Sequence, residues 1–444
     1  MNTTTNSLAE TARQAVSLAR KKGATEASAT ASRAREVGTD WRDGQLDRIT
    51  EATTRSLSLR LFVDGRYSSV STRDLRPEAL ERFIAESVAM ARVLKPDAFR
   101  QLPEPELYTG RALVDLSIED PRQAKLTAEE RRRFVREMEE GARSTDTKGA
   151  FLSVTTSFSD VAREEYSLSS NGFEGSLGGT RFFADSSVSI QDPDGRRPEE
   201  WESATARFLE DLPQAAELGR SCGLRALSRL GAKKDASAVL TMAVDSRAAG
   251  GLVSRLLGAL SGAAIQQKRS FLEGKLEQQV GSSRLAFKDE PHLKRGLGSR
   301  LFDEEGLSTR PRALFEGGTL RSYLIDSYYG RKLKAAPTTG ATSNLAWVVG
   351  SKGQSGLLAD FQEGILVTDF LGGNANLVTG DFSLGIQGFR VRGGRRAEPI
   401  GEMNISGNQL ELWKRLVAVG NDPFVHSALR TPTLVFEGVQ FAGV

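Results

Sequence analysis

Histidine, cysteine and clustered carboxylates are the side chains of this 444-residue sequence that could carry out chemistry. There are two histidines, His292 and His426, and one cysteine, Cys222. Zinc sites collect several His, Cys or carboxylate ligands in one place. The sequence has no His-Glu-x-x-His motif and no Cys-x-x-Cys pair, and its histidines are far apart in the chain. We therefore predict that this chain has no catalytic metal site of its own, and we interpret both histidines as surface or capping residues.

Motifs for nucleophilic catalysis and phosphate binding are also missing. Cys222 has no histidine nearby in the chain to act as its base, so we expect a small buried side chain. There is no Gly-x-Ser-x-Gly elbow and no Walker-type loop. The glycine-rich run 372–381 lacks the basic residue and the following helix that would hold a phosphate. It predicts a strand–turn–strand corner or, alternatively, one wall of a peptide-binding cleft to which Gly372, Gly373 and Asn374 would contribute.

Two groups of carboxylates could in principle do acid–base work. Asp303, Glu304 and Glu305 are consecutive, and Asp369 and Asp381 flank the glycine-rich run. Neighbouring carboxylates can hold their pKa values apart and act as acid and base. Because no histidine or metal motif accompanies them, we interpret both groups as solvated loops.

The segment 251–265 has the spacing of an amphipathic helix. Leu252, Leu256 and Leu260 recur on one face, whereas the opposite line consists of the small residues Ser254, Gly258, Ser261 and Gly262. A glycine inside a helix costs roughly 1 kcal/mol relative to alanine, so this line needs a reason. Small residues let another backbone come close. Tight packing within one domain and contact with a peptide or partner both explain it; in the second case Arg255, Gly258 and Gly262 would make the contacts.

The elements that would hold these residues in place follow from apolar periodicity. We predict an α+β fold, in which an N-terminal mixed α/β domain, 1–235, precedes a strand-rich, mostly antiparallel C-terminal domain, 236–444, with the boundary at 231–235. The patterns predict helices at 7–22, 77–94, 122–144, 198–229 and 245–265. They predict strands within 26–71, at 151–159, 163–170 and 180–192, and over most of the chain from Ser237 to a last strand at 433–436. Turns are expected at Asp43-Gly44, Asp64-Gly65 and Asn171-Gly172.

Composition limits the partners. Lys and Arg number 60 against 57 Asp and Glu, for a net charge of +3, which does not indicate a nucleic-acid partner. No apolar run approaches the roughly 18–20 residues that span a bilayer, and residues 1–8 lack the apolar core of a signal peptide. The single cysteine excludes an intramolecular disulfide and fits a reducing compartment. We expect a cytoplasmic protein that binds neither membranes nor nucleic acid.

Short motifs spread along the chain, in a constant order, resemble the TldD/PmbA family of peptidase subunits, and its TldE (PmbA) branch in particular. The motifs are Asp43–Arg48, Phe62–Arg66, Ser170–Phe173, the segment 250–272, Phe302–Gly306, Tyr323–Leu333, Thr379–Gly385 and Ile405–Asn408.

The resemblance locates a degenerate metal motif. In the TldD branch, the helix matching 254–259 carries His-Glu-x-x-x-His, whose histidines bind zinc and whose glutamate acts on the attacking water. Here Ser254, Arg255 and Ala259 occupy those positions, and no cysteine follows Cys222 where that branch supplies a further ligand. Arg255 is a permanent cation that would repel a metal if it pointed into the pocket. It could instead pair with a carboxylate of a peptide or partner, or lie exposed on the helix.

The resemblance implies a non-catalytic subunit of a heterodimer. A TldD-like chain would supply zinc and hydrolysis, and this chain, without a cofactor, would complete the cleft. The implied substrates are unfolded or leader-bearing peptides, including precursors of modified peptide antibiotics, for which recognition by strand addition is suitable. Two alternatives stay open: an autonomous hydrolase that uses Asp381 with Ser383 or His426, and a peptide-binding or chaperone-like module.

Overall fold

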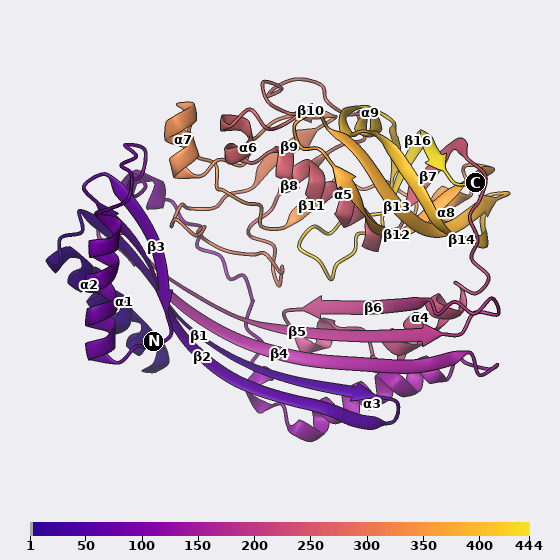
Figure 1. Ribbon diagram of the computed structural model, residues 1–444, viewed down its shortest axis with the longest axis horizontal. Helices are drawn as coiled ribbons and strands as arrows, with labels where there is room; N and C mark the ends of the chain where they lie inside the picture. The colour runs from indigo at the N-terminus through magenta and orange to yellow at the C-terminus, as the bar shows by residue number, and fades with distance from the viewer. Residues whose placement is uncertain (1–2) are drawn as a thin grey trace.

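A six-stranded antiparallel sheet dominates the first half of the computed structural model, which describes residues 3–444. Its long strands curve into a bowl beneath the C-terminal part (Figure 1). Asp43-Gly44 and Asp64-Gly65 form the predicted hairpin turns, with the positive φ angles that such two-residue turns require. In sheet order the strands are β3 (Arg66–Thr72), β2 (Gln45–Val63), β1 (Glu26–Arg42), β4 (Phe151–Ser169), β5 (Glu174–Ile190) and β6 (Glu199–Ala206).

Helices cover the outer, convex face of this first sheet (Figure 1). They are α1 (Thr3–Lys21), α2 (Pro77–Ala91), α3 (Ala128–Arg143) and α4 (Ala215–Leu227). Every second strand residue points towards them, so that Leu57, Leu59 and Leu61 are fully buried in the same apolar core as residues of α1 and α2.

The remaining strand residues form the concave face, which is rich in hydroxyl groups. Some pair across strands, as Thr30 does with Ser167 and Ser32 with Ser56, at 2.8 Å in both cases. Further concave positions, identified by alternation and register, are Ser58, Ser157, Ser159, Ser187, Ser203 and Thr205. The first sheet thus has an apolar covered side and a polar open side.

A second six-stranded sheet organises the C-terminal part. Its order is β14 (Arg395–Asn408), β13 (Asp381–Arg392), β12 (Glu363–Ala375), β7 (Ala238–Val244), β16 (Leu434–Ala442) and β15 (Leu416–Val419). The pair β7–β12 is parallel and the other neighbours are antiparallel, while an additional pairing of β14 with β16 curls the sheet. A small sheet consists of β10 (Thr319–Leu320), β9 (Arg312–Glu316), β8 (Phe287–Asp289) and β11 (Leu345–Trp347).

Short helices complete the C-terminal part: α5 (Ser246–Ala259), α6 (Gly262–Gln266), α7 (Ser327–Leu333), α8 (Gln354–Leu358) and α9 (Gln409–Lys414). The 3-10 turns Pro105–Tyr108, Gln123–Lys125 and Leu209–Asp211 lie in the first half. The face of α5 that contains Leu252 and Leu256 is buried in the same core as β7 and β12. Within residues 3–444, no helix is both long enough and apolar enough to cross a bilayer.

Polar contacts join the first sheet region to the C-terminal part at both ends of the bowl. At one end Arg247 donates to Glu202 at 3.0 Å, and this pair is largely buried. At the other end, Tyr328 of α7 donates to Asp97 at 2.7 Å and Arg331 donates to the carbonyl of Leu102 at 2.6 Å. The chain therefore encloses a space between its two halves.

The α+β prediction is confirmed, and most elements lie where periodicity placed them. Residues 151–159 and 163–170 form the single strand β4, because the alternation continues through 160–162. The helix predicted at 198–229 is wrong in its first part: Glu199–Ala206 is β6, in which the side chains of Glu200 and Glu202 are buried in ion pairs. The predicted helix 245–265 is two helices, since Ser261 caps α6 after α5 ends at Ala259.

Candidate functional site

Helix α5 begins directly after β7, where the side chain of Asp245 accepts a hydrogen bond from the backbone N–H of Arg247 at 2.9 Å and caps the helix. The predicted amphipathic division is confirmed: Leu252 and Leu256 are buried, while Ser254 and Gly258 are exposed. The line of small residues therefore faces solvent along α5.

The side chains at the three positions of the degenerate metal motif are bonded to their own helix or buried. Ser254 Oγ donates to the carbonyl of Gly250 at 2.9 Å, and Arg255 Nη1 donates to the carbonyl of Gly251 at 2.6 Å. Ala259 is fully buried and offers no donor atom. Arg255 is half-buried, and this burial lowers its guanidinium pKa. Because a guanidinium stays cationic, the Ser254 hydroxyl is bonded to its own helix and Ala259 has no ligand atom, these residues do not fit a zinc ion.

The end of β12 and the corner that follows it form a wall beside α5. A Cβ atom at Gly251 would lie 3.5 Å from the ring of Phe370, and one at Gly258 would lie 3.9 Å from Leu377. The run 372–381 makes the predicted strand–turn–strand corner, in which Asn376 N donates to Asp381 O at 2.8 Å. Open space over α5 is thus bordered by this corner.

Gly372, Gly373 and Asn374 are exposed at the end of β12. Gly373 has a φ of 132°, and a Cβ atom there would lie 2.1 Å from the carbonyl oxygen of Ser383 on β13, so only glycine fits. Leu371 beside them is 53% exposed. The surface next to α5 therefore includes an exposed apolar side chain, Leu371, and a strand end at which β12 and β13 approach closely at Gly373.

Half of β12 has one free edge. Strand β7 pairs with β12 only over Gly364–Val367, whereas β13 pairs with it as far as Ala375. For 369–375, no second strand partner occurs among the residues that the structure describes. An extended peptide could add to such an edge through backbone hydrogen bonds.

Gly262 differs from Gly258. It is buried, its N–H donates to the carbonyl of Leu324 at 2.7 Å, and a Cβ atom there would lie 3.0 Å from Tyr329 Cβ. The close backbone approach that small residues allow is thus made inside the chain at Gly262, while Gly258 remains open.

The other candidate nucleophiles and bases lie apart from this surface. His426 Nδ1 lies 3.2 Å from the carbonyl oxygen of Thr205 on β6, and His292 lies 3.3 Å from Thr309. Cys222 is fully buried, and this burial raises its thiol pKa to about 12. In the described range 3–444, no group of three or more His, Cys, Asp or Glu side chains could hold a metal ion.

Asp381 and His426 are not brought together by these contacts, whereas Ser383 lies two residues from Asp381 on the exposed face of β13. Asp381 accepts hydrogen bonds from Thr379 at 2.7 Å and from Asn408 at 2.9 Å, and these bonds lower its pKa. Its side-chain partners thus lie in the corner and at the end of β14, whereas His426 contacts the first sheet.

The interpretation of the acidic cluster as a solvated loop is wrong for Asp303. Only 7% of this residue is exposed, and one carboxylate oxygen accepts hydrogen bonds from the backbone N–H groups of Glu305 and Leu307, both at 2.9 Å. Burial, chiefly, raises its pKa to about 6. Asp369 is half-buried, and desolvation raises its pKa as well. The sequence concealed the environment of Asp303 because a run of carboxylates usually marks an exposed loop.

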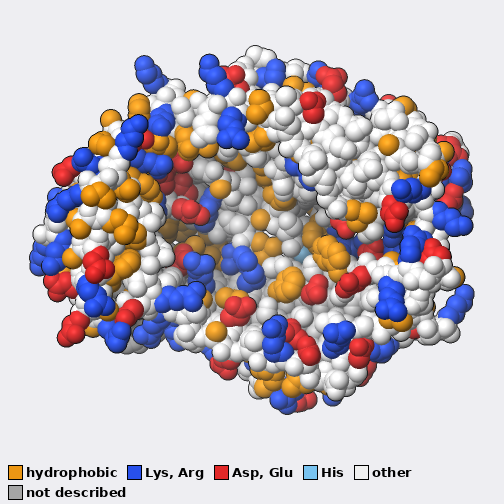
Figure 2. Space-filling model, viewed as in Figure 1, with side chains coloured by type: hydrophobic (Ala, Val, Ile, Leu, Met, Phe, Trp, Pro, Cys, Tyr) orange, Lys and Arg blue, Asp and Glu red, His pale blue; other side chains and the backbone are white. Residues whose placement is uncertain are grey.

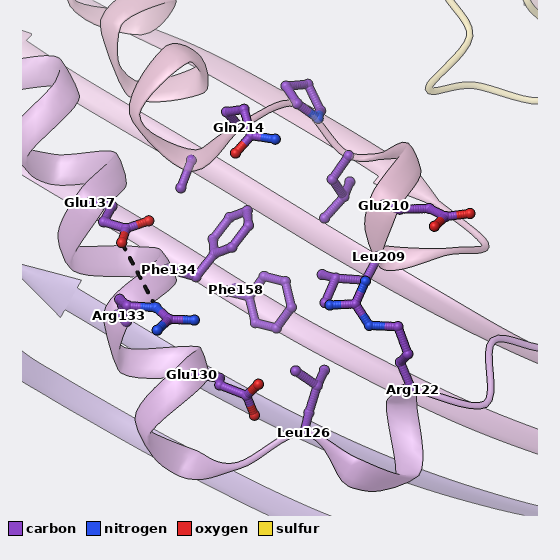
Figure 3. Close-up of a pocket in the computed structure, with 13 residues that line it drawn as sticks. Arg122, Leu126, Glu130, Arg133, Phe134, Glu137, Phe158, Leu209, Glu210 and Gln214 are labelled. Carbon is purple, nitrogen blue, oxygen red and sulfur yellow. Dashed lines mark ion pairs between the residues drawn. The ribbon is translucent and has the colours of Figure 1, made fainter.

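A pocket of about 350 Å³ lies on the convex side of the first sheet, among α3, the turn before α4 and the start of α4 (Figure 3). Phe134 and Phe158 form its floor, and an ion pair of Arg133 with Glu137 at 3.8 Å lies at its rim. It shares no residue with α5 or the β12 corner.

Models of one protein family match three successive segments that together make up most of the chain. Residues 27–91, 121–230 and 237–443 match, in that order, the models of domain 1, the central domain and the C-terminal domain of PmbA/TldA metallopeptidases. The chain is 28% identical to the metalloprotease PmbA of Escherichia coli O157:H7, over 94% of this chain and 92% of that protein. It is 27% identical to a PmbA homologue of Haemophilus influenzae, over 97% and 94% of the two chains.

Solved structures share the fold. A Bacteroides thetaiotaomicron protein described as a "putative modulator of DNA gyrase" is 38% identical, with a TM-score of 0.95 and 98% of each chain covered. TldE from Thermococcus kodakarensis has a TM-score of 0.86 over 98% of this chain and 100% of that one, but its 18% identity supports the fold alone.

Proposed function

This chain belongs to the PmbA/TldD family of metallopeptidases, and we propose that it is the non-catalytic subunit of a heterodimeric zinc peptidase. In this proposal a TldD-like partner binds zinc and hydrolyses the peptide bond, and the present chain completes the substrate cleft. The substrates are unfolded or leader-bearing peptides, including precursors of modified peptide antibiotics. The pair works in the cytoplasm, and this chain carries no cofactor.

The chemistry of three α5 positions carries the proposal. Ser254 and Arg255 both donate to carbonyls of their own helix, and Ala259 is buried without a donor atom. Zinc requires lone-pair ligands and a general base must accept a proton, so a hydroxyl engaged at i−4, a guanidinium and a methyl group serve neither purpose. We therefore derive no catalytic step at this helix and assign hydrolysis to the partner.

The free edge of β12 supports the peptide-binding part of the proposal. Residues 369–375 can offer backbone donors and acceptors to an extended peptide, which suits substrates of many sequences. Ser254 and Gly258 are small and exposed, so no large side chain projects from the neighbouring face of α5 at these positions. Leu371 adds apolar area that a peptide or the partner subunit would cover.

The test compares the purified chain alone with the same chain mixed with a TldD-like protein. We expect zinc only in the mixture or in the partner, and cleavage of an unfolded reporter peptide only when the TldD-like chain is present. Zinc content by mass spectrometry and peptide products by chromatography give the two readouts. One zinc per chain together with robust cleavage by this chain alone would falsify the assignment.

A matched pair of variants tests the surface beside α5. Leu371→Asp places a charge at the free edge and is expected to reduce cleavage by the mixture about tenfold, because apolar contacts at an interface core contribute strongly. Val93→Asp, at an 82% exposed position after α2, is the control and is expected to leave cleavage unchanged. Equal rates for the two variants would remove this surface from the cleft.

A further inference from the structure

A cavity of about 620 Å³ lies on the concave face of the first sheet, away from α5 and the β12 corner. Strands β1 to β5 line one side of it, and residues 300–304 of the C-terminal part line the other. Figure 2 shows the molecule hollowed between its two halves, with Lys and Arg side chains gathered along the margin on the side of the first sheet.

Arginine dominates the charge of this cavity. Three carboxylates, Glu165, Asp303 and Glu304, also line it, and of these Glu165 forms an ion pair with Arg163. The lining arginines are Arg60, Arg163, Arg181, Arg207 and Arg300. We call these five residues the arginine cluster. Cationic side chains outnumber anionic ones even when every carboxylate is ionised.

Arg207 shows how the fold holds a guanidinium here without a counter-charge. Its nitrogens donate to three backbone carbonyls, those of Gly296 at 3.3 Å, Thr180 at 3.2 Å and Leu297 at 2.7 Å. A Cβ atom at Gly179 would lie 2.9 Å from Arg207 Nη1, so a glycine on β5 leaves the space for it. Carbonyl oxygens orient the group but do not neutralise its charge.

Two other members of the arginine cluster also donate to backbone carbonyls. Arg60 donates to the backbone carbonyl of Glu304, and Arg300 donates to that of Ala341 at 2.7 Å while its buried Nε has no partner among the described residues. Arg181 is exposed, and within residues 3–444 it forms no hydrogen bond or ion pair. It also lies close enough to Arg207 to lower that residue's pKa, to which burial contributes more.

Five guanidiniums that outnumber the neighbouring carboxylates repel one another, and an additional anion between them reduces the repulsion. Guanidinium groups bind carboxylates in short, charge-assisted hydrogen bonds. The volume lies in the range of small-ligand pockets, and hydroxyls of Thr30, Ser58 and Ser167 on its wall can pair with a peptide backbone.

We propose that this cavity binds the carboxylate side chains of an acidic peptide segment. The identity of the ligand as a peptide rests on the proposed function, whereas its anionic character rests on the arginine cluster alone. An acidic stretch of a substrate would then be held on the concave face while another part of the chain reaches the partner's zinc.

The test measures binding to the intact purified chain and needs no catalytic partner. A short fluorescein-labelled peptide with glutamate at alternate positions is compared, by fluorescence anisotropy, with the same peptide carrying glutamine. We expect the glutamate peptide to bind at least about tenfold more tightly, with an affinity that falls as salt is added. Arg181→Gln is expected to weaken its binding about tenfold, since an exposed side chain without partners can be removed without affecting the fold.

Arg132→Gln is the matched control, because Arg132 is exposed on α3, outside the cavity, and its loss changes the net charge equally. It is expected to change the affinity less than twofold. Equal affinities for the two peptides, or equal losses in the two variants, would overturn the site. Displacement of the peptide by inorganic phosphate more readily than by glutarate would show that a small phosphate, not a carboxylate peptide, is the ligand. Tight, Arg181-dependent binding without cleavage in the TldD-like mixture would overturn the subunit proposal but retain the anion site.

Discussion

Helix α5 and the arginine cluster differ in whether their polar and charged side chains have partners nearby. On α5, the polar groups of Ser254 and Arg255 are bonded to carbonyls of the same helix, and the buried face is apolar. In the arginine cluster, guanidiniums are fixed by carbonyls of distant segments and Arg181 has no partner within the described residues. The first region is locally satisfied and contributes shape, whereas the second has unbalanced charge that a ligand can relieve. Family resemblance points to α5, but of the two regions only the arginine cluster has an excess charge that a bound anion would neutralise.

The largest expected effect concerns the packed face of α5. Leu256→Ala removes a 1% exposed side chain and should lower the free energy of unfolding by about 2–5 kcal/mol, because the cavity left behind adds to the lost transfer energy. Urea denaturation followed by circular dichroism measures it. A loss below about 1 kcal/mol would show that α5 is not a packed structural element.

Asp303, at the wall of the arginine cluster, should make stability depend on pH. Its pKa is raised from 3.8 to about 6 in the folded chain, so the folded state binds the proton more tightly than the unfolded state. The ionised carboxylate therefore destabilises the fold, fully above pH 6, and this penalty disappears as the pH falls towards 4.

Asp303→Asn keeps the oxygen that accepts from Glu305 and Leu307 but cannot ionise. Relative to the unchanged chain, the variant should gain about 2 kcal/mol of stability between pH 4.5 and pH 7.5. Urea midpoints at the two pH values measure the gain, and Asp47→Asn, at an exposed position on β2, is the control. A difference between the variant and the unchanged chain that stays constant with pH contradicts the raised pKa.

The two glycines of the small-residue line should respond in opposite directions. Gly258→Ala adds a methyl group at ordinary van der Waals distance, 3.9 Å from Leu377, and should stabilise the helix by about 0.5–1 kcal/mol. Gly262→Ala should destabilise it, because the new Cβ atom would lie 3.0 Å from Tyr329. Thermal melts of both variants provide the measurement. Stabilisation by both substitutions would mean that Gly262 is not a site of close packing.

Ser254→Ala should have the smallest effect, a gain of a few tenths of a kcal/mol, because a serine bonded to the i−4 carbonyl is a poorer helix former than alanine. Chemical denaturation measures the change in the free energy of unfolding. Ser261→Ala, which removes the side-chain cap of α6, is measured in parallel as a reference for the loss of a serine that has a structural role. If Ser254→Ala instead cost more than about 1 kcal/mol, the hydroxyl would have a partner outside its own helix, and the contrast with the arginine cluster would fail.

Sequence patterns predicted the regular parts of the molecule because their signals are local. Alternation identified β1 and β2, and Asp43-Gly44 located their turn. Strand β6 was predicted as helix because it lies within 198–229, a stretch that was interpreted as helical as a whole. Ion pairs with the distant Arg225, Arg229 and Arg247 make the burial of Glu200 and Glu202 in a strand possible.

The candidate sites show the same limit. The α5 positions could be identified in advance because a single segment carries the motif. The arginine cluster could not, because its members come from β2, β4, β5, the end of β6 and the loop at residue 300. One weak signal existed: Arg163 and Glu165 on one strand, and Gly179 and Arg181 on the next, are each two residues apart, which places each pair on one face of its strand. Which strands are neighbours, and which face is open, depends on the fold.

The contacts that join the two halves of the chain at both ends of the bowl affect how a ligand can enter. Closing or opening the space like a jaw would break either the Arg247–Glu202 pair or the bonds of Tyr328 and Arg331. We therefore expect the interior to be preorganised, with little free energy spent on closure when a ligand binds. A peptide ligand would then have to enter in an extended conformation. We therefore expect the main barrier to binding to be the unfolding of the peptide, and not a conformational change of this protein.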